Sequence, residues 1–204
     1  MTKWLSPEFP YLIGYYGYLT MPAFVGISII SKYYFSKQGL LLTLSFSVFT
    51  LLNQMFNGAL KRIVMQARPT NQINIVPHDA NTHPRMGMPS GHAQSVAFSL
   101  MFLFRAVEST FLRVIGTIMT FLTVLQRISY RKHTKLQVLV GFTLGSLMGY
   151  VGYESHKWLK ATFESLNIDL TDGKINMGFI GALSLLGLCL LIDKLHLVEK
   201  LKKL

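Results

Sequence analysis

The chain consists of long apolar stretches separated by short polar segments. A helix needs about 20 predominantly apolar residues to cross a bilayer. Six stretches approach that length, at residues 11–30, 40–60, 93–107, 111–125, 136–153 and 175–195. No linker, low-complexity tract or internal repeat divides the sequence. The pattern therefore predicts an all-α, six-transmembrane-helix bundle, formed by a single domain over residues 1–204.

The polar segments between these stretches differ in character. Arg105, Glu108 and Arg113 stand between the short third and fourth stretches, which indicates a tight helical hairpin whose long side chains reach water. Residues 154–174 are polar, and we expect a loop there with room for one interfacial helix.

Two polar loops are predicted to lie at the same membrane face. With six spans, the loops at residues 62–92 and 126–135 share the side that carries both chain ends. Three polar pieces stand where an apolar helix meets water: KRIVMQARPT at 61–70, MPSGHAQS at 88–95 and QRISYRKHTKLQV at 126–138. A site built there can reach the polar head of a lipid whose tail stays in the bilayer.

Composition supports a membrane protein. Half of the residues are hydrophobic and 14% are charged, and the mean hydropathy of +0.38 exceeds that of a typical soluble domain. The single cysteine, Cys189, lies in an apolar run, which argues against a disulfide framework or a zinc set. The first apolar run lacks a small-residue cleavage site, so we expect it to be retained. The sequence predicts an integral, multi-pass membrane protein.

The net charge of +11 limits the partners. Basic residues stand singly at the ends of apolar runs or in short loop clusters, and no long basic arm or amphipathic basic helix suits nucleic acid. Membrane lipids or a phosphate-bearing lipid substrate are therefore the favoured partners. No obligate protein partner is evident.

Three cations indicate an anion site. Lys61, Arg68 and Arg127 have no carboxylate close in sequence, and such a cluster needs a multivalent anion to offset its self-repulsion. Ser90 and Gly91 follow a proline at a predicted helix start, where free backbone N–H groups and the helix dipole attract an anion. Phosphate or diphosphate fits both features.

Two histidines supply candidate chemistry. His92 and His133 are able to attack or protonate near neutral pH. The CxxxxxR loop of cysteine phosphatases is absent, and the acidic residues show no cluster that would hold two metals. The residues therefore favour phosphoryl transfer through a phosphohistidine, with neither metal nor other cofactor.

Together, the three pieces resemble the signature of the type 2 phosphatidic acid phosphatase (PAP2) superfamily, K-x6-R-P, P-S-G-H and S-R-x5-H-x3-D. Gln126 stands at the serine position and Gln137 at the final aspartate position. Dolichyl-diphosphatases and the glucose-6-phosphatase group carry glutamine at the latter place. The stretches GMPSGHAQ and RKHTKLQVLVG resemble the dolichyl-diphosphatase versions, and the similarity covers residues 51–149.

The resemblance implies a role for each site residue. His133 attacks phosphorus, and His92 protonates the departing oxygen and later activates water. The oxygens of the phosphoryl group are held by Lys61, Arg68, Ser90, the Gly91 N–H and Arg127. Gln137 lies one helical turn after His133, where its oxygen can accept from the imidazole and fix the tautomer. The other histidines, His78, His83, His156 and His196, are assigned to loops and interfaces.

Alternatives stay open for these residues. Ser90 is also an ordinary helix cap. Lys61, Arg62, Arg131, Lys132 and Lys135 also fit topogenic positive charges, the interpretation favoured for Arg62, Lys132 and Lys135. Gln137 also fits a lipid-phosphate-binding relative without catalysis. A transporter or channel is disfavoured, because the predicted spans carry no ionisable residue near their middle.

The resemblance narrows the substrate to a polyprenyl diphosphate such as dolichyl diphosphate, with phosphatidate or another lipid phosphate as the main alternative. Lys200 and Lys202 resemble a dilysine signal, which favours the endoplasmic reticulum over the plasma membrane. That signal needs a cytosolic tail, and six spans would then place the site in the cytosol, whereas dolichyl-diphosphatases are expected to face the lumen. The sequence leaves the orientation open.

Overall fold

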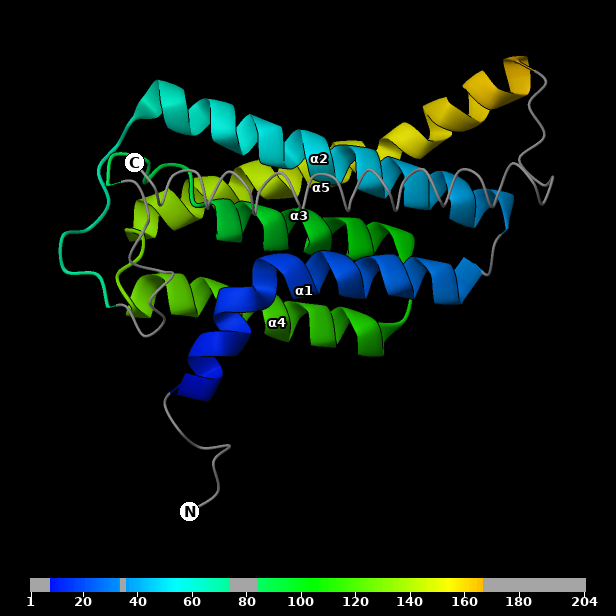
Figure 1. Cartoon of the computed structure of the whole chain (residues 1–204). Coiled ribbons are helices and arrows are strands. Elements are labelled where there is room, and N and C mark those ends of the chain that lie inside the picture. Colours follow the sequence, from blue (N-terminus) through cyan, green and yellow to red (C-terminus); the bar gives the residue numbers. More distant parts are fainter. Residues whose placement is uncertain (1–7, 34–35, 74–83, 167–204) are drawn as a thin grey trace, which may run out of the picture.

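A computed structural model describes residues 8–33, 36–73 and 84–166. These residues form five α-helices and no strand: α1 (Glu8–Tyr33), α2 (Lys37–Val64), α3 (Gly91–Ala106), α4 (Thr110–Ser129) and α5 (Lys135–Ser165). The helices lie roughly side by side as a bundle (Figure 1). Each helix overlaps one of the predicted spans. The sixth predicted span lies outside the described residues, as do Cys189, Lys200, Lys202, His78, His83 and His196.

The all-α class is confirmed for the described residues, whereas the count of six spans is not. Three helices, α2, α4 and α5, are long and apolar enough to cross a membrane. Helix α3 has 16 residues, fewer than a bilayer-spanning helix usually needs. It lies in the centre of the bundle, in contact with each of the other four helices.

Residues 154–165 differ from the expected loop because they continue α5. Glu154 accepts from Arg105 at 2.6 Å and so joins this segment to the end of α3. On the opposite side of the helix, Leu159 and Phe163 pack against the start of α2. The segment is therefore amphipathic, and its polar composition reflects one exposed face.

The core forms around α3. Its buried aromatic and aliphatic side chains pack with residues of α1 and α2, and the main members are Met21, Val25, Ile29, Leu42, Phe46, Phe98, Phe102 and Leu103. Helix α5 approaches α3 closely because glycines face it. A Cβ atom at Gly145 would overlap the carbonyl of Gln94, and one at Gly141 would lie 2.5 Å from the carbonyl oxygen of Ser90. This contact brings the start of α5 against the start of α3.

The α3–α4 hairpin is as tight as predicted, and Arg113, which is half-buried, folds back onto the end of α3. Its guanidinium donates to the carbonyl oxygens of Val107 and Phe104, each at 2.8 Å. These carbonyls belong to the end of α3, which would otherwise lack donors. The hairpin lies at the end of the bundle opposite the predicted site.

Candidate active site

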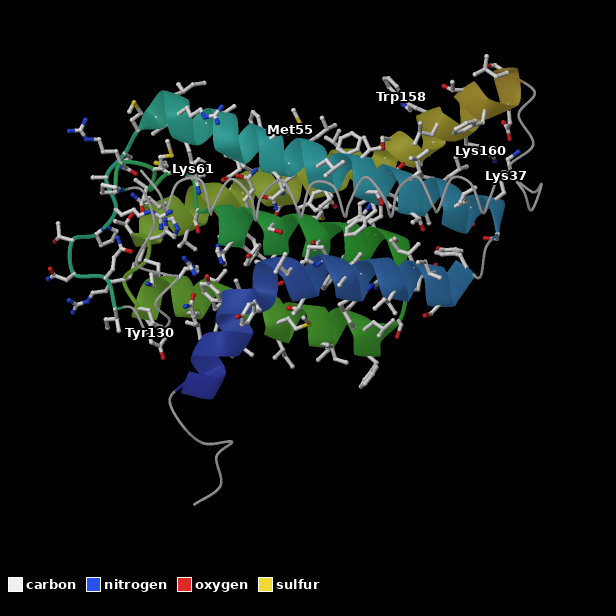
Figure 2. The ribbon with its side chains drawn as sticks, viewed as in Figure 1. Lys37, Met55, Lys61, Tyr130, Trp158 and Lys160 are labelled. Carbon is white, nitrogen blue, oxygen red and sulfur yellow. The ribbon has the colours of Figure 1, made fainter. Side chains whose placement is uncertain are left out.

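The predicted site residues come from separate segments that meet at one end of the bundle. This end holds the last turns of α2 and α4 and the first turns of α3 and α5 (Figure 1). Lys61 lies on the last turns of α2 (Figure 2). The other predicted residues are Arg68 after α2, Ser90, Gly91 and His92 at the start of α3, Arg127 on α4, and His133 and Gln137 around the start of α5.

The two ring nitrogens of His133 have different partners. Nδ1 lies 2.8 Å from the carbonyl oxygen of Gly87 and 3.3 Å from Oε1 of Gln137. Both oxygens can only accept, so Nδ1 carries the proton and Nε2 keeps its lone pair. Nε2 faces the Arg68 guanidinium, 3.4 Å away. The nitrogen able to attack an electrophile therefore points toward a cation that would hold an anion.

Gly87 is a site residue that the sequence reasoning missed. Its backbone carbonyl is a nearer acceptor for the imidazole than the Gln137 side chain, to which the orienting role was assigned. A backbone carbonyl leaves no mark on the sequence, because every residue has one.

Burial and nearby cations lower the pKa of His133 to about 2. Burial is the largest cause, followed by Arg68, Arg127 and Lys61, while the bond to Gly87 acts in the opposite direction. The imidazole is therefore neutral at physiological pH, the form in which it is a nucleophile. An anion bound among the cations would offset their effect.

Gln137 is fully buried and connects three segments. Its Oε1 accepts from the Thr134 N–H at 3.1 Å, and the Thr134 hydroxyl accepts in return from the Gln137 N–H, which forms a capping box at the start of α5. Its Nε2 donates to Gln66 Oε1 at 3.0 Å and to the Ala67 carbonyl at 2.8 Å. These donors orient the amide so that its oxygen faces His133.

The start of α3 differs from an ordinary capped terminus. Ser90 is the N-cap residue, yet its side chain makes no capping hydrogen bond. Its hydroxyl is buried and finds no hydrogen-bond partner among the described residues. Leaving such a group unpaired costs about 1–3 kcal/mol, so native structures usually pair it with protein, water or ligand.

Lys61 lies beside this helix start. A Cβ atom at Gly91 would lie 3.5 Å from the Lys61 ammonium and 3.0 Å from Asn57 Oδ1, so glycine leaves this space open. Asn57 donates to Gln94 at 2.7 Å, and Gln94 donates to Asn53 Oδ1 at 2.8 Å. This buried amide network joins α2 to the first turn of α3 next to the site. Its sequence signal was amide side chains spaced four residues apart within the second apolar stretch.

Arg127 is 2% exposed and donates to Gln126 Oε1 at 3.1 Å. The glutamine that stands at the signature's serine position therefore holds this guanidinium. The Arg127 carbonyl accepts from the N–H groups of Lys132 and His133, at 3.0 and 3.2 Å. The turn that carries His133 is thus folded back onto the end of α4.

The exposure of the remaining basic residues agrees only in part with the prediction that they are topogenic charges. Arg62 and Lys135 are exposed, as topogenic charges would be. Lys132, assigned to the same class, is fully buried, because the tight turn directs its side chain into the protein. His156 lies on the later part of α5, away from the site residues.

Comparisons with known proteins match the part of the chain that contains the predicted site residues. The sequence model of the PAP2 superfamily matches residues 42–161. Lipid phosphate phosphatase epsilon 2, chloroplastic, of Arabidopsis thaliana is 34% identical over 113 residues, which are 50% of this chain and 35% of that protein. Dolichyldiphosphatase of Saccharomyces cerevisiae is 29% identical over 113 residues, 48% of this chain and 45% of that protein. The chain thus spans less than half the length of these relatives.

A solved structure shares the fold. It is the crystal structure of the first transmembrane PAP2 type phosphatidylglycerolphosphate phosphatase from Bacillus subtilis. The TM-score is 0.56 at 21% sequence identity, over 77% of this chain and 79% of that one. At this identity the likeness concerns the arrangement of helices.

Proposed function

The chain belongs to the PAP2 superfamily, and we propose that it hydrolyses a polyprenyl diphosphate, such as dolichyl diphosphate, to the monophosphate and inorganic phosphate. The observation that carries the proposal is the state of His133. Its imidazole is held by Gly87 so that Nε2 keeps a lone pair, and Arg68 lies beside that nitrogen. This is the arrangement that a metal-free phosphohistidine mechanism requires.

The first chemical step forms the phosphohistidine. The Nε2 lone pair of His133 attacks the terminal phosphorus, and the bond from phosphorus to the bridging oxygen breaks. His92 gives its proton to that oxygen, so the lipid monophosphate leaves. The Nδ1–H of His133 stays bonded to the Gly87 carbonyl, which stabilises the positive charge on the phosphorylated ring.

The second step restores the enzyme. His92, now neutral, takes a proton from water while the water oxygen attacks phosphorus and the P–N bond breaks. Inorganic phosphate leaves, and His92 is again protonated. In both steps the negative oxygens would lie among Lys61, Arg68 and Arg127, with the Ser90 hydroxyl and the Gly91 N–H as further donors. Gln137 supports the turn that holds His133.

Three observations support a lipid diphosphate as substrate. The site residues lie where helices end, so a bound head group would leave its tail in the bilayer. Three cations suit the charge of a diphosphate, and the yeast relative is named a dolichyldiphosphatase. The same resemblance supports the endoplasmic reticulum membrane. The Arabidopsis relatives, named lipid phosphate phosphatases, favour phosphatidate or another lipid phosphate as the second candidate.

The test is phosphate release by detergent-purified protein in the presence of chelator. We expect release from dolichyl diphosphate exceeding that from phosphatidate, abolished by His133→Ala and kept by the control His156→Ala. A preference for phosphatidate would overturn the substrate class and keep the mechanism. No release by wild-type protein that still binds diphosphate would mean a binding protein without catalysis.

A further inference from the structure

Helix α1 precedes the region matched by the superfamily, yet it supplies aromatic side chains to the site. The Tyr18 ring lies with its centroid 4.3 Å from that of the His92 imidazole, at an interplanar angle of 52°. Tyr15, one turn earlier, lies 5.9 Å from the same imidazole. The proposed proton donor therefore packs against a helix to which the superfamily signature assigns nothing.

A proline explains how α1 reaches this position. Pro22 lies inside α1 and has no N–H to donate to the carbonyl four residues earlier, which belongs to Tyr18. The Ser95 hydroxyl of α3 donates to that carbonyl instead, at 3.1 Å. Figure 1 shows α1 bending along its length, as a helix does near an internal proline. Ser95 lies one turn after His92, so the same face of α3 binds both the backbone and the ring of Tyr18.

The first half of α1 is also fixed on its other side. A Cβ atom at Gly14 would lie 2.5 Å from Gln126 Cβ, and one at Gly17 would overlap the Thr123 side chain. These glycines let α1 approach the turn of α4 that precedes Arg127. Tyr18 thus lies between the helix that carries His92 and the helix that carries Arg127.

We propose that Tyr18 is a positioning residue for His92, which rests on the proposed function. A histidine on the first turn of a helix has several staggered rotamers. The Tyr18 ring covers one side of the imidazole and selects the rotamer that delivers the proton to the departing oxygen. The proposed effect resides in the packing of the Tyr18 ring against the imidazole.

The inference predicts a defect that depends on the leaving group. The lipid alkoxide released from phosphatidate needs a proton as it leaves, whereas nitrophenolate leaves readily without one. Tyr18→Leu is therefore expected to lower kcat for phosphatidate by about 10- to 100-fold, within the usual contribution of a positioned acid, with little change in KM. With 4-nitrophenyl phosphate, the variant keeps the burst of nitrophenolate but turns over slowly, because His92 must still activate water.

Two matched variants serve as controls. Tyr18→Phe keeps the ring, so its kcat is expected to stay within about twofold of the wild-type value. The loss expected for Tyr18→Leu is larger because that change disturbs the positioned acid. Tyr16→Leu removes an exposed tyrosine of the same helix and is expected to resemble wild type. An equal loss in burst and turnover, or wild-type kcat in Tyr18→Leu, would overturn the inference.

A measurement independent of activity separates this inference from the proposed function. The His92 imidazole carbon-bound proton signal, assigned with His92→Ala, is expected to shift in Tyr18→Leu and to stay in Tyr18→Phe, because the ring current of Tyr18 acts on it. An unchanged signal in Tyr18→Leu would overturn the contact. If wild-type protein hydrolyses no lipid phosphate, and Tyr18→Leu still shifts the His92 signal, only the proposed function is refuted. The positioning of His92 by Tyr18 then stands.

Discussion

The Nδ1 atom of His133 lies 2.8 Å from the carbonyl oxygen of Gly87. A backbone carbonyl keeps the same charge at every pH, so it holds the imidazole in one tautomer without a carboxylate. The PAP2 signature places an aspartate where this chain has Gln137, and the glutamine oxygen lies 3.3 Å from the same nitrogen. The neutral partners of His133 therefore account for its orientation despite this departure.

The pH dependence of stability tests the burial of His133. Its folded pKa of about 2 lies below the usual value of about 6.5 in an unfolded chain. The unfolded chain binds the extra proton below about pH 6.5, so this group lowers the free energy of unfolding as the pH falls, by at most about 1.4 kcal/mol per pH unit. Unfolding of purified protein should show a shallower slope below that pH in His133→Ala than in His156→Ala. Equal slopes would contradict a buried neutral imidazole.

Ser90→Ala separates a phosphate ligand from an ordinary cap. The Ser90 hydroxyl makes no capping bond, so we expect unchanged or slightly higher stability. Substrate binding should weaken about tenfold or more, since a hydrogen bond to a charged group is worth about 1.5–3 kcal/mol. The control is Ser36→Ala, which removes a side chain that accepts from the Gly39 N–H at 3.1 Å. That variant should lose about 0.5–2 kcal/mol of stability and no affinity. A loss of stability with unchanged affinity in Ser90→Ala would show that Ser90 caps the helix instead of binding phosphate.

Restoring the signature aspartate at Gln137 should not improve the enzyme. A carboxylate cannot donate to Gln66 and Ala67, which accept from the Gln137 amide at 3.0 and 2.8 Å. Gln137→Asp is therefore expected to lower stability by about 1–3 kcal/mol, the net contribution of these two hydrogen bonds, and to lower kcat. Gln38→Leu, at an exposed position, should change neither property. Higher kcat with unchanged stability in Gln137→Asp would mean that His133 lacks a charged partner it needs.

Glycine substitutions test the close contact of α5 with α3. A Cβ atom at Gly145 would overlap the Gln94 carbonyl, whereas one at Gly58 of α2 would meet nothing within 4 Å. Gly145→Ala should lower the free energy of unfolding by about 1–3 kcal/mol. Gly58→Ala should raise it by up to about 1 kcal/mol through helix propensity. Thermal unfolding of both variants in one detergent compares them directly, and equal shifts would refute the close approach.

Much of this arrangement was predictable because it follows from local patterns. The lengths of apolar runs report helices, so the approximate places of α1 to α5 follow from the sequence. Helices joined by turns alternate in direction, which brings the starts of α3 and α5 to the end of the bundle that holds the last turns of α2 and α4. His92, Arg127 and His133 therefore meet at one end even though they are far apart in sequence.

The remaining features depend on tertiary contacts. The Gly87 carbonyl has no sequence signature, and the burial of Lys132 depends on how one turn folds onto α4. The extension of α5 to Ser165 was missed because residues 154–165 are mostly polar in sequence. Their few apolar side chains are buried only by packing against α2. The contact of Tyr18 with His92 requires Pro22 and Ser95 to act together across two helices.

The most direct test of the mechanism is to trap the phosphoenzyme. Protein given substrate labelled with ³²P in the transferred phosphate is quenched rapidly, and the labelled peptide is identified. We expect acid-labile, base-stable label on His133, absent from His133→Ala. The label should accumulate in His92→Ala supplied with 4-nitrophenyl phosphate that carries ³²P, because loss of the water-activating base slows hydrolysis of the phosphohistidine. Label that persists in His133→Ala, or turnover without any phosphohistidine, would contradict the account.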